Sequence, residues 1–274
     1  MDSLYDRLRA LERIENAYAR WADYRAKLTA FLLRNTELGA AVTVFGAGMC
    51  NDLDLAALTG HCSRVTLVDR DTDSVHEGLR LQGIGAERVN VRYADFVGIS
   101  DAAYRAIEQD TVAAIRRGAN DAGAVTKTFL TAYAAAFAAR RPQLDAIPEA
   151  DYAVACGVHS QLLTMPVRMA YVLSRYAPLD TDAVEARVRA DNTAAADGLT
   201  ETMQKSARRG IFLGLETNRV GETDGIEGAR QALDGVSRMR KAVTAEAELI
   251  WPLDEAQKKV YSVRVVKIAD LCTL

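Results

Sequence analysis

The segment Ala41-Val-Thr-Val-Phe-Gly-Ala-Gly48 decides the fold of this chain. Its β-branched run predicts a short strand, and its glycines permit a sharp turn whose backbone can lie close to a ligand. The helix that we predict next, from Asn51 to Leu58, would present free N–H groups and the positive end of its dipole to that turn. A strand, a glycine turn and a helix in this order are typical of an α/β fold that binds a nucleoside.

Strands and helices alternate along the rest of the chain. We predict further strands at 64–69, 88–93, 151–156 and 210–215, and helices at 71–82, 102–117, 125–141, 161–176, 180–208 and 225–236. This alternation indicates a parallel sheet covered by helices. The last two predicted strands, 243–251 and 259–268, are joined by a connection too short for a parallel crossover, so they should form an antiparallel hairpin. The predicted fold class is therefore α/β, with a seven-stranded, doubly wound, mostly parallel sheet.

Two helical segments are additional to this sheet. Apolar residues recur at three- and four-residue steps through the first 38 residues, which predicts one long helix or two shorter ones ending at Gly39. We interpret residues 1–38 as an N-terminal helical lid and residues 39–274 as one domain. Within that domain, residues 101–147 contain no strand pattern and are predicted to form a helical insertion.

The composition is that of an ordinary globular protein. The 274 residues are 49% hydrophobic and 26% charged, with a net charge of −3, which excludes a disordered chain and offers no basic surface for nucleic acid. Four cysteines and three histidines lack the spacing of a zinc site, so we predict no metal. A charged N-terminus and the lack of a long apolar run predict a cytoplasmic protein without a membrane span.

Acidic residues follow the second and third predicted strands. Asp69 lies about twenty residues after Gly48, the spacing at which an acid can accept hydrogen bonds from ribose hydroxyls. Asp95 and Phe96 follow the next strand, where a carboxylate can accept from an amino group and a ring can pack on a flat base. Taken singly, these features are also typical of a tight turn, a solvated acid and a helix cap. Together they predict an adenosine pocket.

Asn51 stands where a dinucleotide fingerprint has its third glycine, which argues against NAD or FAD. From about residue 40 onward, the chain instead resembles the class I S-adenosylmethionine-dependent methyltransferases. The resemblance rests on Gly46-Ala-Gly48, Val68-Asp69, Ala94-Asp95-Phe96, the strand 151–156 and the closing hairpin. It implies a seven-stranded sheet whose last strand is antiparallel to the others. It also implies S-adenosylmethionine as cofactor and S-adenosylhomocysteine as product.

The resemblance also assigns roles to residues. The residues that it places around the cofactor are Gly46, Ala47, Gly48, Asp52, Asp69, Arg70, Asp95, Phe96, Cys156 and Gly157. The glycine turn would approach the methionine portion, Asp69 the ribose, and Asp95 with Phe96 the adenine. Two departures occur: Val44 replaces an acid common two residues before the first glycine, and Cys50 replaces a frequent third glycine. We expect Asp52 to replace the missing contact to the amino group of the cofactor.

The residues for the acceptor are less specific. We expect His159 as a general base, because it follows the fourth strand and has a near-neutral pKa, although a histidine at a helix entry is often only hydrogen-bonded to backbone. Tyr18, Trp21 and Tyr24 would suit a cationic amine, or would simply pack in the core. Glu216 and Asn218, after the fifth strand, complete the expected acceptor side.

The sequence thus predicts an S-adenosylmethionine-dependent methyltransferase that acts on a small molecule, an amine or a hydroxyl. The first alternative is an enzyme that cleaves or cyclises the aminocarboxypropyl arm of the same cofactor. The second is a non-catalytic nucleoside-binding domain, and an NAD-dependent oxidoreductase is disfavoured. We expect neither nucleic acid nor a membrane as partner. The charged segment 180–209 is interpreted as a solvated helix face, with a pocket wall or a homodimer contact as its alternatives.

Overall fold

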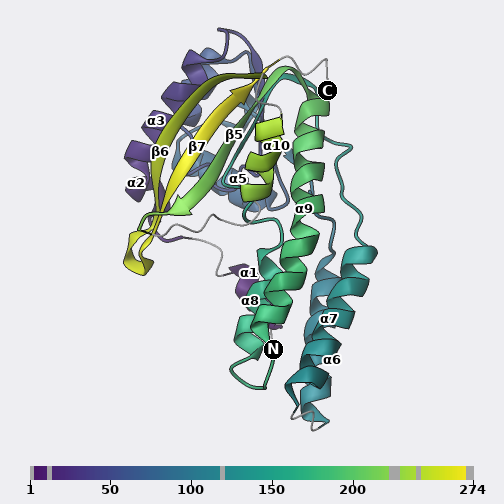
Figure 1. Ribbon diagram of the computed structural model, residues 1–274. Helices are drawn as coiled ribbons and strands as arrows, with labels where there is room; N and C mark the ends of the chain where they lie inside the picture. Colours follow the sequence, from purple (N-terminus) through teal and green to yellow (C-terminus); the bar gives the residue numbers. More distant parts are fainter. Residues whose placement is uncertain (1–2, 11–13, 118–120, 222–228, 239–241, 270–274) are drawn as a thin grey trace. The chain divides into compact units, whose positions relative to one another are not determined.

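The structure, a computed structural model, describes residues 3–10, 14–117, 121–221, 229–238 and 242–269. The strands are β1 (Ala41–Phe45), β2 (Arg64–Asp69), β3 (Asn90–Tyr93), β4 (Ala150–Cys156), β5 (Ala207–Arg219), β6 (Val243–Asp254) and β7 (Lys259–Ile268). The helices are α1 (Leu4–Ala10), α2 (Ala17–Arg20), α3 (Ala22–Arg34), α4 (Leu55–His61), α5 (Thr72–Leu81), α6 (Asp101–Arg116), α7 (Ala122–Ala138), α8 (Thr164–Leu173), α9 (Thr181–Ser206) and α10 (Ala229–Arg238). Figure 1 shows this arrangement.

The strands form one seven-stranded sheet in the order β3-β2-β1-β4-β5-β7-β6. β1, β2, β3, β4 and β5 pair in parallel, whereas β7 is antiparallel to both β5 and β6. Every residue of β1 is buried, as expected for a central parallel strand covered on both faces. The predicted fold class is confirmed, including the single strand that runs against the others.

Several element boundaries differ from the prediction. The first helix after the glycine turn begins at Leu55 rather than at Asn51, because the Asp54 carboxylate caps it by accepting a hydrogen bond from the Ala57 N–H at 2.9 Å. The N-terminal pattern forms three helices instead of one or two, and α3 ends at Arg34, before Gly39. β5 extends from Ala207 to Arg219, well beyond the predicted 210–215, because it pairs with β4 and β7 on its two sides.

The chain divides into two compact units. The sheet unit comprises Glu15–Phe96, Gln143–Gln161 and Ala196–Leu274, and the helical unit comprises Met1–Ile14, Val97–Pro142 and Leu162–Ala195. Residues 1–38, predicted as one lid, are therefore shared: α1 belongs to the helical unit, and α2 and α3 belong to the sheet unit. The helical unit contains most of the predicted insertion and also α8 and the first part of α9.

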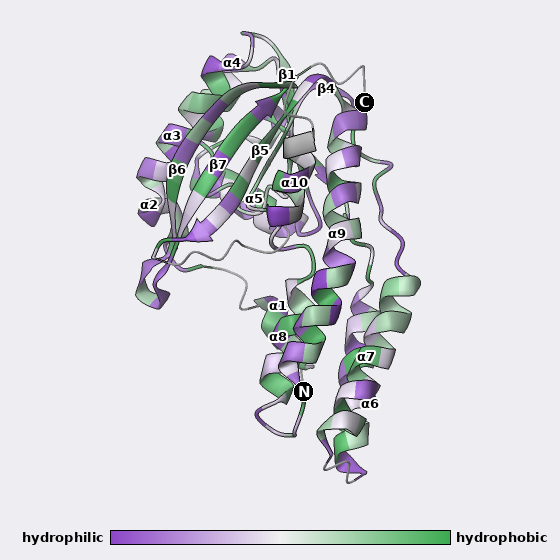
Figure 2. Cartoon of the chain, viewed as in Figure 1, coloured by the Kyte–Doolittle hydropathy of each residue, from purple (hydrophilic) through white to green (hydrophobic). Residues whose placement is uncertain are grey.

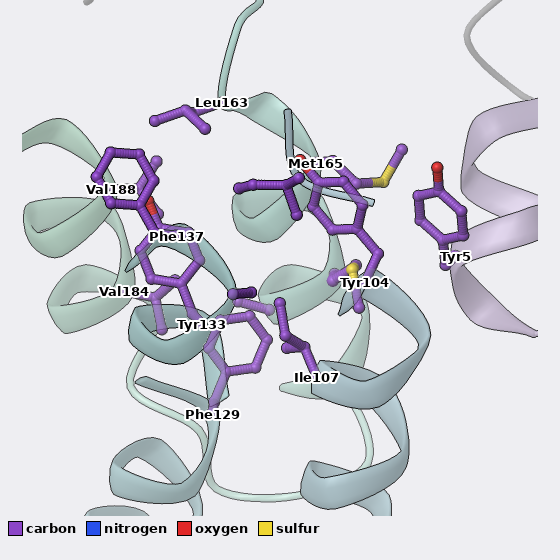
Figure 3. Packing of buried hydrophobic residues seen from close by; sticks show 14 of the residues in the cluster. Tyr5, Tyr104, Ile107, Phe129, Tyr133, Phe137, Leu163, Met165, Val184 and Val188 are labelled. Atoms are coloured by element: carbon purple, nitrogen blue, oxygen red, sulfur yellow. The ribbon is translucent and has the colours of Figure 1, made fainter. Parts of the chain in front are cut away.

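The helical unit has a hydrophobic core of its own (Figure 3). Tyr5 of α1 stacks on Tyr104 of α6 with ring centroids 5.0 Å apart, and Phe129 and Tyr133 of α7 are fully buried. Val184 and Val188 of α9 belong to the same cluster. In Figure 2, α6, α7 and α9 carry both hydrophilic and hydrophobic residues, as expected for helices with one buried side.

In the sheet unit, α3 packs against β6 and α10 packs against β5. The carboxyl ends of β1, β2, β3, β4 and β5 all meet at one edge of the sheet, because these strands are parallel. Every residue predicted to contact cofactor or acceptor belongs to this unit. Among the described residues, no helix combines the length and the apolar character that crossing a membrane requires.

Candidate functional site

The glycine turn after β1 is held against β2. Gly46 and Gly48 have φ angles of +66° and +48°, which L-residues with side chains rarely adopt. The N–H groups of Gly46 and Ala47 donate to the Val68 carbonyl at 2.9 and 3.2 Å. A Cβ atom on Gly46 would lie 2.5 Å from Val158 Cγ2, so a larger residue would displace the segment that follows β4. The turn therefore requires glycine for conformation and for space.

Cys50 has a left-handed backbone conformation although it carries a side chain. Its φ angle is +50°, which is rare for residues other than glycine. The side chain is buried, and burial raises the pKa of the thiol. Gln82 also holds this loop, because its Nε2 donates to the carbonyls of Cys50 and Leu53 at 2.8 and 3.1 Å. No local pattern marks Gln82, since its contacts lie about thirty residues away along the chain.

Asp69 at the end of β2 binds the glycine turn through a hydrogen bond. Its Oδ2 accepts from the Gly48 N–H at 2.8 Å, and its Oδ1 accepts from the Asp71 N–H at 2.7 Å. Burial raises the pKa of this carboxyl, against the lowering effect of those hydrogen bonds. An ionised carboxylate has about four lone-pair positions, so further donors can bind to Asp69. The spacing of Gly48 and Asp69 thus brings the two residues into direct contact.

Asp95 and Phe96 lie beside Asp69, because β3 pairs with β2. Asp95 is 6% exposed, and the guanidinium Nε of Arg70 lies 3.6 Å from its Oδ2. The Phe96 ring packs on Phe45 of β1 with ring centroids 5.8 Å apart. The backbone of Asp95 pairs with Gln143 in both directions, at 3.1 and 2.9 Å, which fixes the direction of the chain after β3. A carboxylate and a partly exposed ring thus lie at one place, as predicted.

The segment after β4 makes close contacts with its surroundings. Gly157 has a φ angle of +66°, and its N–H donates to the Gly214 carbonyl of β5 at 2.9 Å. A Cβ atom on Gly157 would lie 2.8 Å from Cζ3 of Trp251 and 3.5 Å from Oε1 of Glu216. Burial raises the pKa of the preceding Cys156 thiol, so this partly buried cysteine is a thiol rather than a thiolate.

Two carboxyl groups with raised pKa values lie next to this segment. Burial raises the pKa of Asp52 to about 6, although the nearby positive charge of Arg25 lowers it. Glu216 is 4% exposed and its pKa is also raised by burial. Oε1 of Glu216 accepts from Ser160 Oγ at 2.8 Å, whereas Oε2 is buried and has no hydrogen-bond partner. Burial raises the pKa of Tyr24, and the charges of both carboxyls add to this effect.

Trp21 and Tyr24 from the N-terminal segment pack on Trp251 of β6. Tyr24 stacks on Trp251 with centroids 5.6 Å apart, and Trp21 contacts it edge-on at 5.1 Å. Both residues are buried, so they form a packed wall beside Gly157 rather than an open aromatic surface. Tyr18 lies apart from this cluster and stacks under the guanidinium of Arg25. Trp251 was not predicted as a site residue, because the strand that contains it shows no functional motif.

The side chains of His159 and Asn218 form contacts that the sequence did not predict. The imidazole of His159 is 0% exposed, its Nε2 lies 3.2 Å from Thr200 Oγ1, and burial lowers its pKa to about 4. A pKa of about 4 makes the imidazole a weak proton acceptor, which disfavours the predicted role as a base. Asn218 bonds locally: its Oδ1 accepts from Thr217 Oγ1 at 2.9 Å. Glu216 is thus the acceptor-side residue with free hydrogen-bonding capacity.

The described residues contain no cluster of His, Cys, Asp and Glu suited to a metal ion. Cys50, Cys62 and Cys156 are free, and Cys272 lies outside the described residues.

No protein-family model and no curated protein matches the sequence. Among solved structures, similar ones include the N-methyltransferase NodS from Bradyrhizobium japonicum in complex with S-adenosylhomocysteine (11% identity, 98% of this chain and 100% of that chain, TM-score 0.47). YjhP from E. coli has 11% identity over 97% of this chain and 99% of that chain, with a TM-score of 0.48. Magnesium protoporphyrin IX methyltransferase from Synechocystis has 10% identity over 97% and 94%, with a TM-score of 0.45. Because these identities and TM-scores are low, we base the function on the residues of this chain alone.

Proposed function

We propose that this protein is an S-adenosylmethionine-dependent methyltransferase that acts on a small molecule. The observation that carries the proposal is the bond between the glycine turn and Asp69, the 2.8 Å contact from the Gly48 N–H to Oδ2. It places an acid with remaining lone pairs beside a backbone that leaves room for a ligand. Both lie at the carboxyl edge of the parallel strands, where ligands of open α/β sheets bind.

The residues present fit each part of this cofactor. The remaining acceptor positions of Asp69 suit the two ribose hydroxyls. Asp95 and Phe96 suit the amino group and the flat face of adenine, with Arg70 orienting the carboxylate of Asp95. Asn51 Oδ1 is buried without a hydrogen-bond partner close to the glycine turn. Together with Asp52, it can accept hydrogen bonds from an ammonium group.

The protein contributes mainly binding and orientation. The cofactor, when bound, supplies a methyl group on positively charged sulfur, which is already a good leaving group. The buried wall of Trp21, Tyr24 and Trp251 excludes water beside Gly157. Residues that align a nucleophile with a methyl group lower the activation free energy through proximity, by up to roughly 7–11 kcal/mol in favourable cases. His159 is not needed in this scheme, because its lowered pKa makes it a weak proton acceptor.

The small-molecule acceptor is proposed because the groups on the acceptor side are enclosed. Glu216, Trp251 and Tyr24 are all buried, and large polymers cannot reach groups enclosed in this way without rearrangement. The net charge of −3 also gives no attraction for nucleic acid. We further propose a cytoplasmic location, since the three described cysteines are unpaired.

Two measurements test this function. S-adenosylmethionine and S-adenosylhomocysteine should each raise the melting temperature, since a ligand that binds only the folded state stabilises it by mass action. Incubation with S-adenosylmethionine and a mixture of small amines and alcohols should then produce S-adenosylhomocysteine, detected by mass spectrometry. Methylthioadenosine as the product would contradict methyl transfer and indicate cleavage of the aminocarboxypropyl arm. A melting temperature unchanged by millimolar cofactor would contradict the assignment as a whole.

A further inference from the structure

We infer that the methyl acceptor is an amine, and that Glu216 holds the acceptor nitrogen and removes its proton. This inference rests on the proposed function and adds to it the chemical class of the acceptor and the identity of the base. Its basis is the Glu216 oxygen that lacks a hydrogen-bond partner among the described residues, together with the groups that surround this carboxyl.

Glu216 is a buried carboxyl group with unused hydrogen-bonding capacity. Ser160 Oγ donates to Oε1 at 2.8 Å, while Oε2 is buried and accepts from no donor among the described residues. Burying a charged or polar atom without a partner costs free energy, and an ionised carboxylate costs most. A native protein that retains such a group supplies it with a partner, and a bound cation with N–H donors is the partner that suits a carboxylate best.

Among the described residues, no Lys, Arg or His forms an ion pair with Glu216. Tyr24 from α3, Asp52 from the loop after β1 and Cys156 from β4 are the titratable groups that interact with it or with one another here. The guanidinium of Arg25, whose charge acts on Asp52, donates to the carbonyls of Tyr18 and Asn51. A buried carboxyl without a cation among the described residues favours a positively charged ligand.

Aromatic and backbone groups converge at the same place. The position that a Cβ atom of Gly157 would occupy lies 3.5 Å from Glu216 Oε1 and 2.8 Å from Trp251 Cζ3. Gly157 is therefore packed closely against the indole ring, with the Glu216 carboxyl beside it. An aromatic ring attracts a cation, most strongly where water is excluded, but gives little to a neutral hydroxyl. Val158, the next residue, lies against the glycine turn, so the indole ring and the Glu216 carboxyl adjoin the proposed cofactor site.

The geometry also explains how the nitrogen becomes a nucleophile. An ammonium group has no lone pair, so it must first transfer one proton to the Glu216 carboxylate, which becomes a neutral carboxylic acid. The freed lone pair then forms the N–C bond to the methyl group while the S–C bond breaks. The electrons of that bond stay on sulfur, and the positive charge moves from sulfur to the methylated nitrogen. Burial raises the pKa of Glu216, which makes the carboxylate a better proton acceptor.

The test uses the whole protein, saturated with S-adenosylhomocysteine, and three pairs of probes of equal shape. The pairs are methylamine and methanol, butylamine and butanol, and phenethylamine and phenethyl alcohol. Calorimetric melting at pH 7.5 measures each probe on the wild type, on Glu216→Gln and on the control Glu201→Gln. Glu201 is the matched control because it is exposed on α9 and paired only with Lys205, so its loss removes the same charge elsewhere.

At least one amine should raise the melting temperature of the wild type and of the Glu201 variant, and its alcohol should not. The affinity of Glu216→Gln for that amine should be roughly tenfold to hundredfold lower, as expected for loss of a charge-assisted hydrogen bond. An alcohol as effective as its amine, no effect of any amine, or an unchanged affinity in Glu216→Gln would overturn the inference. Ser160→Ala leaves the carboxylate in place and should retain the amine effect.

A second measurement covers the case in which Glu216→Gln folds poorly. In the wild type, amine affinity should fall as the pH is lowered from 8 to 5, because Glu216 and Asp52, both with raised pKa values, lose their charge while the amine keeps its own. A pH-independent affinity would contradict the inference. Binding of S-adenosylhomocysteine is recorded separately in every sample. If the wild type does not bind S-adenosylhomocysteine, the proposed function is contradicted. The amine titration is then repeated without S-adenosylhomocysteine, and this still tests the amine site.

Discussion

At the scale of single residues, Asp69 and Glu216 show two ways of placing a carboxylate at the edge of one sheet. Asp69 is anchored by two backbone N–H groups, and in the proposed function it would bind a ligand as well as the loop. Glu216 is anchored through one oxygen only, so its second oxygen remains for a ligand. The difference suggests that Asp69 organises the cofactor side and Glu216 the acceptor side.

His159 leads to a prediction about pH and stability. Burial lowers its pKa to about 4 in the folded protein, from an ordinary value near 6.5. Between these values the unfolded chain binds a proton that the folded protein does not, so stability should fall as the pH is lowered from 6.5 to 4. Relative to His159→Gln, the wild type should lose roughly 3 kcal/mol over this interval. Urea unfolding of both proteins at several pH values measures this, and parallel curves would contradict the burial of the imidazole.

Gly157 leads to a prediction about local packing. Alanine at this position would place its Cβ atom 2.8 Å from Trp251 Cζ3 and would require a φ angle of +66°. We expect Gly157→Ala to destabilise the protein by roughly 1–3 kcal/mol and to shift the tryptophan fluorescence. The control is Gly60→Ala, because Gly60 lies in α4 and a Cβ atom there meets no other atom within 4 Å. Unchanged fluorescence in Gly157→Ala would mean that Trp251 does not cover this glycine.

At the scale of elements, the sequence predicted most strands and helices because each carries its own periodicity. β1, β2 and β7 match their predicted ranges, since runs of β-branched residues between polar ends are a local signal. The glycine turn and Asp69 were predictable for the same reason: both lie at the end of a recognisable strand. The strand order adds the contact between them, because parallel neighbours end at the same edge.

The remaining part of the site could not be predicted, because it depends on contacts between distant segments. Ser160 meets Glu216 across 56 residues, and Gln82 reaches Cys50 across 32. Neither residue belongs to a motif, and an ordinary serine or glutamine gives no local signal. The burial of His159 similarly follows from its packing near Thr200 of α9, which the short segment after β4 does not reveal.

The start of α4 provides a prediction at the scale of one element. Asp54 caps this helix by accepting from the Ala57 N–H, and α4 follows directly after the proposed cofactor loop. Asp54→Ala should lower the free energy of unfolding by about 1 kcal/mol, within the usual range of roughly 0.5–2 kcal/mol for a lost cap. Asp110→Ala, an exposed position within α6, is the control and should change stability much less. Equal effects in urea unfolding would argue against the cap.

At the scale of the whole molecule, the helical core and the residues proposed for chemistry belong to different units. The helical unit has a complete core, whereas every residue that we assign to cofactor or acceptor belongs to the sheet unit. In the proposed function, the acceptor specificity would depend on Trp21, which lies between α2 and α3, on Tyr24 of α3 and on Trp251 of β6.

A core substitution in the helical unit tests this separation. Phe129 of α7 is fully buried in the cluster of Figure 3, so Phe129→Ala should cost roughly 3–5 kcal/mol of stability. Hydrogen exchange should show lost protection in α6 and α7, while the affinity for S-adenosylhomocysteine stays within about twofold, a difference well below 1 kcal/mol. A large loss of affinity at a temperature where the sheet unit remains protected would show that the helical unit contributes to the cofactor site.

The central claim is that the glycine turn and Asp69 bind the adenosine portion of the cofactor. Isothermal titration calorimetry of S-adenosylhomocysteine tests it with the wild type, with Asp69→Ala and with Asp73→Ala, which removes an exposed acid from the first turn of α5. We predict one binding site per chain, an affinity loss of roughly 1.5–3 kcal/mol in Asp69→Ala, and no loss in Asp73→Ala. Absence of binding to the wild type, or equal affinity in Asp69→Ala, would contradict the claim.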